Sequence, residues 1–223
     1  MRFWGMVVFG VLGTAILLSL GMWQLQRLAW KQELLRAIES KILAPAVEIP
    51  QTVLLDAHSL LPVRAEGRYK GDTVRVLVSQ KIYGAGYRLI TAFELVDGRT
   101  IMLDRGFISV RAEMPSTPEG RGQVIGNLQW PQEIDSFTPE NDLAANIWFA
   151  RDVARLADHL KAEPVLLVLR DSSFETEVAT PLPKMTANIP NDHTNYAITW
   201  FSLALIWLGM SGYFLYRSRD PQS

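Results

Sequence analysis

The sequence contains no cysteine, only three histidines and no surplus of positive charge. The absence of cysteine excludes a disulfide framework, a thiolate zinc site, a cysteine nucleophile and an iron–sulfur cluster. The three histidines, His58, His159 and His193, include no pair at metal-ligand spacing. With 22 Lys and Arg against 23 Asp and Glu, the net charge is −1. Too little positive charge is therefore present to neutralise phosphates, and no nucleic-acid partner is expected.

Two long uncharged segments lie near opposite ends of the 223-residue chain. Residues 3–22 and residues 196–216 contain no Asp, Glu, Lys or Arg. Helices of about 20 residues span the roughly 30 Å hydrocarbon core of a bilayer. Aromatic residues such as Trp23 and Tyr196 lie at the segment ends, as is typical of residues at headgroup depth. Both segments are predicted to be transmembrane helices, so the lipid bilayer is an expected partner.

One face of the first segment carries small residues. Gly10, Gly13 and Gly21 recur at helical spacing, which favours close contact with a second helix. A cleaved signal peptide is the alternative interpretation, but the apolar run exceeds the 7–15 residues usual for a signal core. Two spans place residues 24–195 on one side of the membrane and both ends on the other. Charge alone leaves the orientation open, because the positive-inside rule loses force for a large translocated domain.

The central region has the pattern of a small β-rich domain. Asp97-Gly98 is a strong hairpin signal, since both residues tolerate the positive φ of a tight turn. Strands are predicted at 63–69, 74–80, 87–95, 99–103, 122–130, 146–150 and 165–170, with a short helix at 152–161. Residues 171–192 hold three prolines and are predicted to form a loop returning to the membrane.

The expected fold class is therefore an α+β membrane protein. N- and C-terminal transmembrane helices flank a β-rich, antiparallel, barrel-like extramembrane domain with short helices. The predicted divisions are a first transmembrane helix at 3–22, an interfacial helical extension at 23–44, a β-rich domain at 45–190 and a second transmembrane helix at 196–216.

Motifs of the common enzyme classes are missing. The sequence has no HExxH and no G-x-S-x-G, and Gly84-Ala85-Gly86 lacks the third glycine and following helix of a nucleotide-binding loop. Carboxylates such as Asp97, Asp104, Asp171 and Glu175 show no pairing at the sequence level. The protein is expected not to be an enzyme, and a membrane-anchored enzyme is the least favoured hypothesis.

His193 differs from the other two histidines in its position. It lies three residues before the second uncharged segment, at the predicted membrane–water boundary. On a helix that begins near Asn191, it shares a face with Ala197, Trp200, Ala204 and Trp207. A neutral imidazole there is suited to ligate haem iron, and the two alanines are expected to leave room for a flat macrocycle.

Other residues near this boundary complete a candidate haem site. Tyr196 and Trp200 offer aromatic packing, and Arg27 and Lys31, which follow the first span, are suited to pair with haem propionates. The alternatives are that His193 is an interfacial anchor or helix-start residue, and that the cationic and aromatic side chains form a belt at the headgroups.

Three blocks of the sequence carry specific patterns. Residues 21–31 read GMWQLQRLAWK, which fits G-x-W-Q-x-x-R-x-x-W-K, and residues 191–201 read NDHTNYAITWF, which fits N-x-H-x-x-Y-A-x-T-W-F. The central block consists of Gly67-Arg68-Tyr69, Gly86-Tyr87, Asp97-Gly98 and Asp104-Arg105-Gly106-Phe107-Ile108. Together these blocks resemble the Surf1 (Shy1) family of oxidase assembly proteins along the whole chain. In the central block, Asp104, Phe107 and Ser109 replace the Asn, Trp and Pro of the family pattern.

The resemblance implies a location and a function. It implies a multi-pass protein of the bacterial cell inner membrane with a periplasmic central domain and cytoplasmic termini. It also implies an assembly factor for a haem-copper terminal oxidase, which binds haem a transiently and assists its delivery to oxidase subunit I, with haem a synthase as a further partner. The haem-linked histidine of the family matches His193. The alternative is a cofactor-free scaffold that binds oxidase subunits during assembly.

Overall fold

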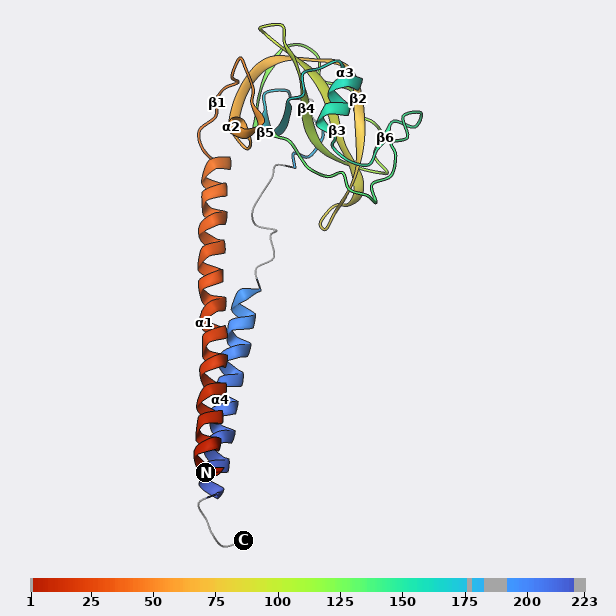
Figure 1. Ribbon diagram of the computed structural model, residues 1–223. Helices are drawn as coiled ribbons and strands as arrows, with labels where there is room; N and C mark the ends of the chain where they lie inside the picture. Colours follow the sequence, from red (N-terminus) through yellow and green to blue (C-terminus); the bar gives the residue numbers. More distant parts are fainter. Residues whose placement is uncertain (1, 176–177, 183–191, 219–223) are drawn as a thin grey trace. The chain divides into compact units, whose positions relative to one another are not determined.

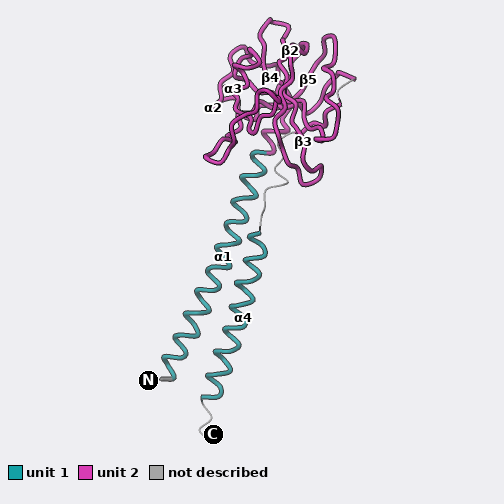
Figure 2. The backbone as a smooth tube through the Cα atoms, turned by 90° about the vertical axis from the view of Figure 1, so that its right-hand side faces the viewer, with its two compact units in different colours: residues 1–38, 186–223 teal, residues 39–185 magenta. Residues whose placement is uncertain are grey.

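The computed structural model describes residues 2–175, 178–182 and 192–218 (Figure 1). The chain divides into two compact units, which Figure 2 shows in different colours. One unit combines residues 1–38 with residues 186–223, and the other comprises residues 39–185. The first contains both predicted spans, and the second contains residues 45–185 of the β-rich domain predicted at 45–190.

The helical unit is built from two long helices, α1 (Arg2–Ile42) and α4 (His193–Arg217). α1 continues unbroken through residues 23–42 because this stretch has no proline or glycine and is rich in good helix formers. It ends shortly before Pro45, which cannot continue a helix. Both helices are long and apolar enough to cross a membrane by length and composition. The predicted helices are confirmed, and their placement in a membrane stays a prediction.

Small residues bring α1 and α4 close together. A Cβ atom built on Gly10, Gly13 or Gly21 would lie only 3.0, 2.3 or 2.7 Å from its nearest side-chain neighbour. Those neighbours are, in order, Ser211, Trp207 and Phe201 of α4. The Trp207 indole Nε1 also donates a hydrogen bond to the Gly10 carbonyl oxygen at 3.1 Å. The small-residue face predicted for helix contact is thus confirmed.

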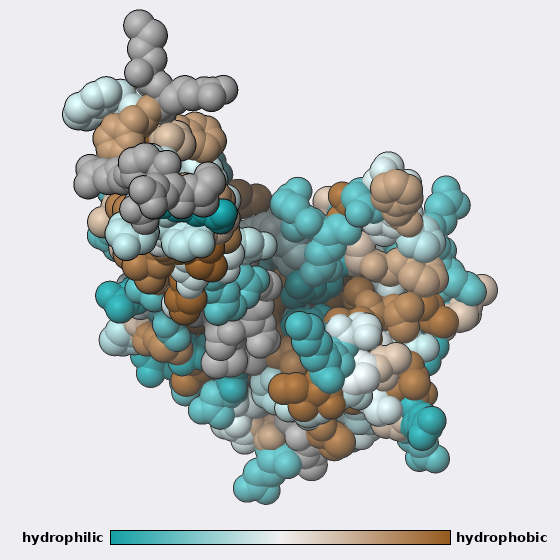
Figure 3. Space-filling model, turned by 90° about the horizontal axis from the view of Figure 1, so that it is seen from below, coloured by the Kyte–Doolittle hydropathy of each residue, from teal (hydrophilic) through white to brown (hydrophobic). Residues whose placement is uncertain are grey.

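The surface of the helix pair is largely apolar over residues 3–22 and 196–216. Large side chains such as Phe9 and Leu205 are exposed, and hydrophobic residues, coloured brown, are visible on the helices in Figure 3. Such a surface is costly in water and stable in lipid. It supports the prediction that these segments span a bilayer.

The other unit is a sheet of seven strands with two short helices. The strands are β1 (Val47–Glu48), β2 (Pro62–Gln80), β3 (Gly84–Leu95), β4 (Thr100–Ser109), β5 (Gly122–Gln129), β6 (Ile147–Trp148) and β7 (Leu166–Ser172). The helices are α2 (Leu55–His58) and α3 (Val153–Leu160). The strand order is β1-β2-β3-β4-β7-β5, and β5 also pairs with β2, so the path from β2 through β5 closes on itself.

The sheet is mixed, so the prediction of an antiparallel sheet is confirmed only in part. β4 and β7 pair in parallel, as do β1 with β2 and β2 with β6. The chain passes through β5, β6 and α3 between β4 and β7, and a connection that long can return a strand in the same direction. β7 is nearly fully buried along Leu166–Leu169, as is typical of a strand with a continuous apolar run.

The main differences in strand boundaries lie where polar residues interrupt the apolar pattern. One strand, β2, contains both predicted strands, 63–69 and 74–80. Between them the chain does not turn; instead, Gly71 adopts a φ of +71° at an irregularity in the pairing between Lys70 and Thr73. β4 extends past Leu103 through Asp104 to Ser109. The Asp97-Gly98 hairpin between β3 and β4 is confirmed, with Gly98 at a φ of +88°.

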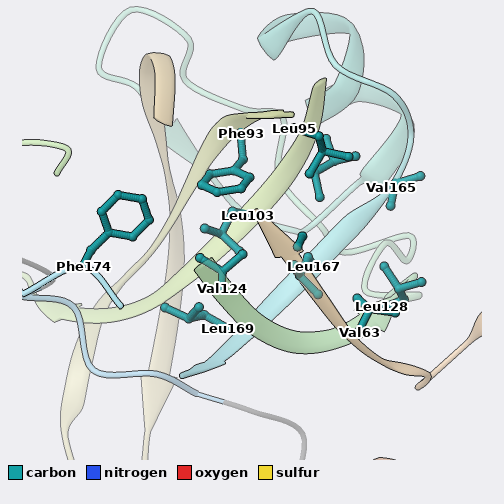
Figure 4. Packing of buried hydrophobic residues seen from close by; sticks show 12 residues of the cluster. Val63, Phe93, Leu95, Leu103, Val124, Leu128, Val165, Leu167, Leu169 and Phe174 are labelled. Carbon is teal, nitrogen blue, oxygen red and sulfur yellow. The ribbon is translucent and has the colours of Figure 1, made fainter. Parts of the chain in front are cut away.

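Side chains from the closed ring of strands fill the centre of this unit. Phe93 of β3, Leu103 of β4, Val124 of β5 and Leu167 of β7 are each completely buried, and Figure 4 shows them gathered in one cluster. A second cluster packs α3 against the sheet through Val153, Leu156 and Ala157. The predicted helix at 152–161 is therefore confirmed, with Asp152 as its N-cap.

Candidate functional site

His193 is the first residue of α4, where it meets Gln24 of α1. The His193 Nδ1 atom and the Gln24 Oε1 atom lie 2.8 Å apart in a hydrogen bond. Gln24 is buried, with 8% of its surface exposed, and His193 is half-buried. Sequence reasoning selected His193 but not Gln24, although Gln24 lies in the first of the three patterned blocks. A neutral glutamine carries no charge signal, and its partner is 169 residues away.

The helix face that His193 shares with Ala197 and Ala204 is occupied by the helix pair. Both alanines are buried, with 2% and 3% of their surfaces exposed, and Trp207 on the same face lies against Gly13. The expectation that these alanines leave room for a flat macrocycle is wrong for this arrangement. Tyr196, three residues after His193, is instead 56% exposed.

The remaining predicted residues lie nearby on the two helices. Arg27 and Lys31 follow Gln24 by three and seven residues, so they continue its face of α1. The Arg27 guanidinium lies 4.0 Å from the centroid of the Trp30 ring in a cation–π contact, which fits the alternative of an aromatic and cationic belt. Lys31 and Trp200 are half-buried. The structure brings His193 together with Gln24, and the roles of the other four residues stay predictions.

A single histidine ligand suits a metal that is already bound by a cofactor, such as the iron of a haem. Among residues 2–175, 178–182 and 192–218, no group of three or more His, Asp or Glu side chains could hold a metal ion. A haem iron already has four nitrogen ligands and takes one axial histidine. Gln24 Oε1 contacts the Nδ1 atom of His193, so Nε2 is the ring nitrogen that a haem iron could take. His193 therefore fits a haem as a single axial ligand.

A buried ionic cluster lies in the β-rich unit. The Asp104 carboxylate has no exposed surface and pairs with Arg88, and also with Arg151 at 3.4 Å. Arg151 pairs in turn with Glu133. Burial alone would raise the pKa of Glu133, but the hydrogen bonds and charge of Arg151 hold that pKa below its ordinary value.

Arg88, Arg151 and Glu133 line a cavity of about 430 Å³. One sequence feature points to this cluster, namely Asp104 at the position where the family pattern has Asn. The arginines that compensate Asp104 lie 16 and 47 residues away. The cluster contains two positive and two negative groups. We therefore expect it to stabilise the fold of the β-rich unit.

The fold and the site together define a class of protein. In its sequence a β-rich domain lies between two apolar helices, and a histidine lies where those helices contact each other. The chain belongs to the SURF1 family, whose model matches residues 11–205. This confirms the family predicted from the three patterned blocks.

Curated relatives extend over most of the chain. The SURF1-like protein of Rickettsia prowazekii is 30% identical over 225 residues, covering 94% of this chain and 88% of the relative. Human Surfeit locus protein 1 is 30% identical over 212 residues, covering 83% of this chain and 69% of the relative. The SURF1-like protein of Rickettsia felis is 27% identical over 200 residues, covering 85% and 88%.

Proposed function

We propose that this protein is an assembly factor for a haem-copper terminal oxidase that binds haem a at His193 and assists its delivery to oxidase subunit I. SURF1 family proteins are involved in cytochrome oxidase assembly and are not known as enzymes. The observation that supports haem binding is the 2.8 Å hydrogen bond between His193 and Gln24. It holds a half-buried imidazole in a tautomer suited to ligate iron.

Each candidate residue has a defined part in this proposal. His193 ligates the iron through Nε2, while Tyr196 and Trp200 pack on the macrocycle. Arg27 and Lys31 pair with the two propionates. A single axial ligand from the protein suits transient binding, because the haem must leave for subunit I. Haem a synthase is the partner expected to supply it.

The proposed location follows from the two apolar helices. They fit a multi-pass protein, which we place in the bacterial cell inner membrane with both termini in the cytoplasm. The β-rich unit then lies in the periplasm, and His193 lies at the periplasmic membrane surface. A haem is stable at such a boundary, because its apolar ring can lie in lipid while its charged propionates stay in water.

Replacing the candidate ligand tests the site. Full-length His193→Ala, purified in detergent from cells that make haem a, is expected to carry at least about tenfold less haem than the wild type, because the axial bond is lost. The absorption spectrum and the haem-to-protein ratio measure this. The matched control is His159→Ala, which removes a histidine of the other unit and should keep wild-type haem. Equal haem content in both variants would remove His193 from the site.

A cofactor-free scaffold is the second candidate function. Its candidate contact residues are Phe137 and Leu143 on the loop between β5 and β6, which are 90% and 61% exposed and would be available to an oxidase subunit. If the scaffold function is correct, the protein should co-purify with oxidase subunit I at wild-type yield in a strain that cannot make haem a. Loss of this association without haem a would contradict a scaffold role and favour haem-dependent delivery.

A further inference from the structure

We propose that Gln24 is a positioning residue that selects the tautomer of His193 and thereby makes Nε2 the ligating atom. The inference rests on the proposed function for its haem, but the tautomer itself is a property of the protein alone. The Gln24 amide oxygen lies 2.8 Å from Nδ1. An amide oxygen only accepts, so the neutral ring is protonated at Nδ1 and unprotonated at Nε2.

Burial makes this hydrogen bond a strong constraint. Gln24 is 8% exposed, so water competes poorly for its oxygen, and an unmet acceptor in its place would be costly. Histidines that ligate metals commonly donate their other N–H group to a protein acceptor. Removing that acceptor typically lowers metal affinity by about 10–100-fold. Gln24 occupies the position of such an acceptor.

His58 shows that the protein does not impose one tautomer on every histidine. The backbone N–H of Leu54 donates to the Nδ1 atom of His58 at 2.9 Å. His58 must therefore be unprotonated at Nδ1 and, when neutral, protonated at Nε2. The two rings are expected to be opposite tautomers, which gives His193 an internal reference within the same molecule.

The position of Gln24 couples the ligand site to helix pairing. Gln24 follows Gly21 by three residues on α1, so it extends the small-residue face that packs against α4. Gly21 lies directly against the Phe201 ring of α4. The acceptor thus reaches His193 only when the two helices are paired, and the tautomer reports on that pairing.

The test uses full-length protein in detergent, with its three histidines labelled with ¹⁵N. Above neutral pH, the ring nitrogen shifts should show His193 protonated at Nδ1 and His58 at Nε2. Gln24→Leu should remove the preference of His193 for Nδ1 and weaken haem binding by about 10–100-fold. Gln24→Glu keeps an acceptor, so it should retain the tautomer and the ligation. It should also shift the haem reduction potential to more negative values, because a carboxylate makes the imidazole a stronger donor.

The matched control is Gln26→Leu, the same replacement at an exposed glutamine two residues along α1, which should leave the tautomer and haem binding unchanged. An unchanged His193 tautomer in Gln24→Leu would overturn the inference even if the wild type binds haem. A wild type that binds no haem would instead overturn the proposed function, and the tautomer would still test Gln24.

Discussion

The substitution Asp104→Asn is expected to destabilise the β-rich unit by about 3–5 kcal/mol, because it leaves the buried guanidiniums of Arg88 and Arg151 without their shared carboxylate. Asp104 has no exposed surface, so water cannot take over the lost pairing. For a protein of this size, the loss corresponds to a fall of about 6–20 °C in the thermal midpoint. Near-ultraviolet circular dichroism of the detergent-purified full-length protein measures it.

The control for this experiment removes the same charge from an exposed ion pair. Glu48 pairs with Arg64 at 3.0 Å, but the side chains are 78% and 42% exposed. Glu48→Gln should therefore change stability by less than about 1 kcal/mol. Equal thermal midpoints for Asp104→Asn and Glu48→Gln would show that the buried cluster does not stabilise this unit.

The substitution Gly13→Leu is expected to separate α1 from α4. Even a Cβ atom at this position would lie 2.3 Å from the Trp207 indole nitrogen, so a leucine requires either the Trp207 side chain or a helix to move. Overpacking of this kind costs about 1–3 kcal/mol. It would also break the hydrogen bond from Trp207 to the Gly10 carbonyl oxygen, which is 3.1 Å long.

The absence of native cysteine gives a direct measurement of helix pairing. Cysteines introduced as Gly10→Cys and Ser211→Cys should form a disulfide in membranes after a small local shift, since a Cβ atom on Gly10 would lie 3.0 Å from Ser211 Cβ and a disulfide needs about 3.5–4.5 Å between the two Cβ atoms. Adding Gly13→Leu should reduce the cross-linked yield about tenfold. Adding Gly5→Leu, where a Cβ meets nothing within 4 Å, should leave it unchanged. Full cross-linking in the Gly13→Leu background would contradict the close packing of the helices.

Local sequence patterns predicted most of the fold. Both long helices follow from uncharged runs, and the hairpin between β3 and β4 follows from Asp97-Gly98. The errors arise where long-range contacts decide the outcome. The parallel pairing of β4 with β7 depends on a connection of more than 50 residues, and no local pattern encodes it. Val47–Glu48, which forms β1, was missed because two residues carry no periodicity.

The candidate site divides in the same way. The position of His193 at the start of an apolar segment indicated it from sequence alone. Gln24, by contrast, acquires its importance only when α1 and α4 pair. Asp104 likewise appears in sequence as one carboxylate among many, and its compensation by Arg88 and Arg151 becomes visible only after β3, β4 and the segment before α3 have folded together. Polar partners distant in sequence are the part of a site that local reasoning misses.

The most direct test of haem a handling is the absorption spectrum of the full-length wild-type protein, purified in detergent from cells that make haem a. The matched sample comes from cells in which haem a synthesis is blocked. The account predicts a haem absorption band in the first sample and none in the second. Protein from haem-a-producing cells that shows no haem band, while still co-purifying with oxidase subunit I, would contradict haem binding and favour the scaffold.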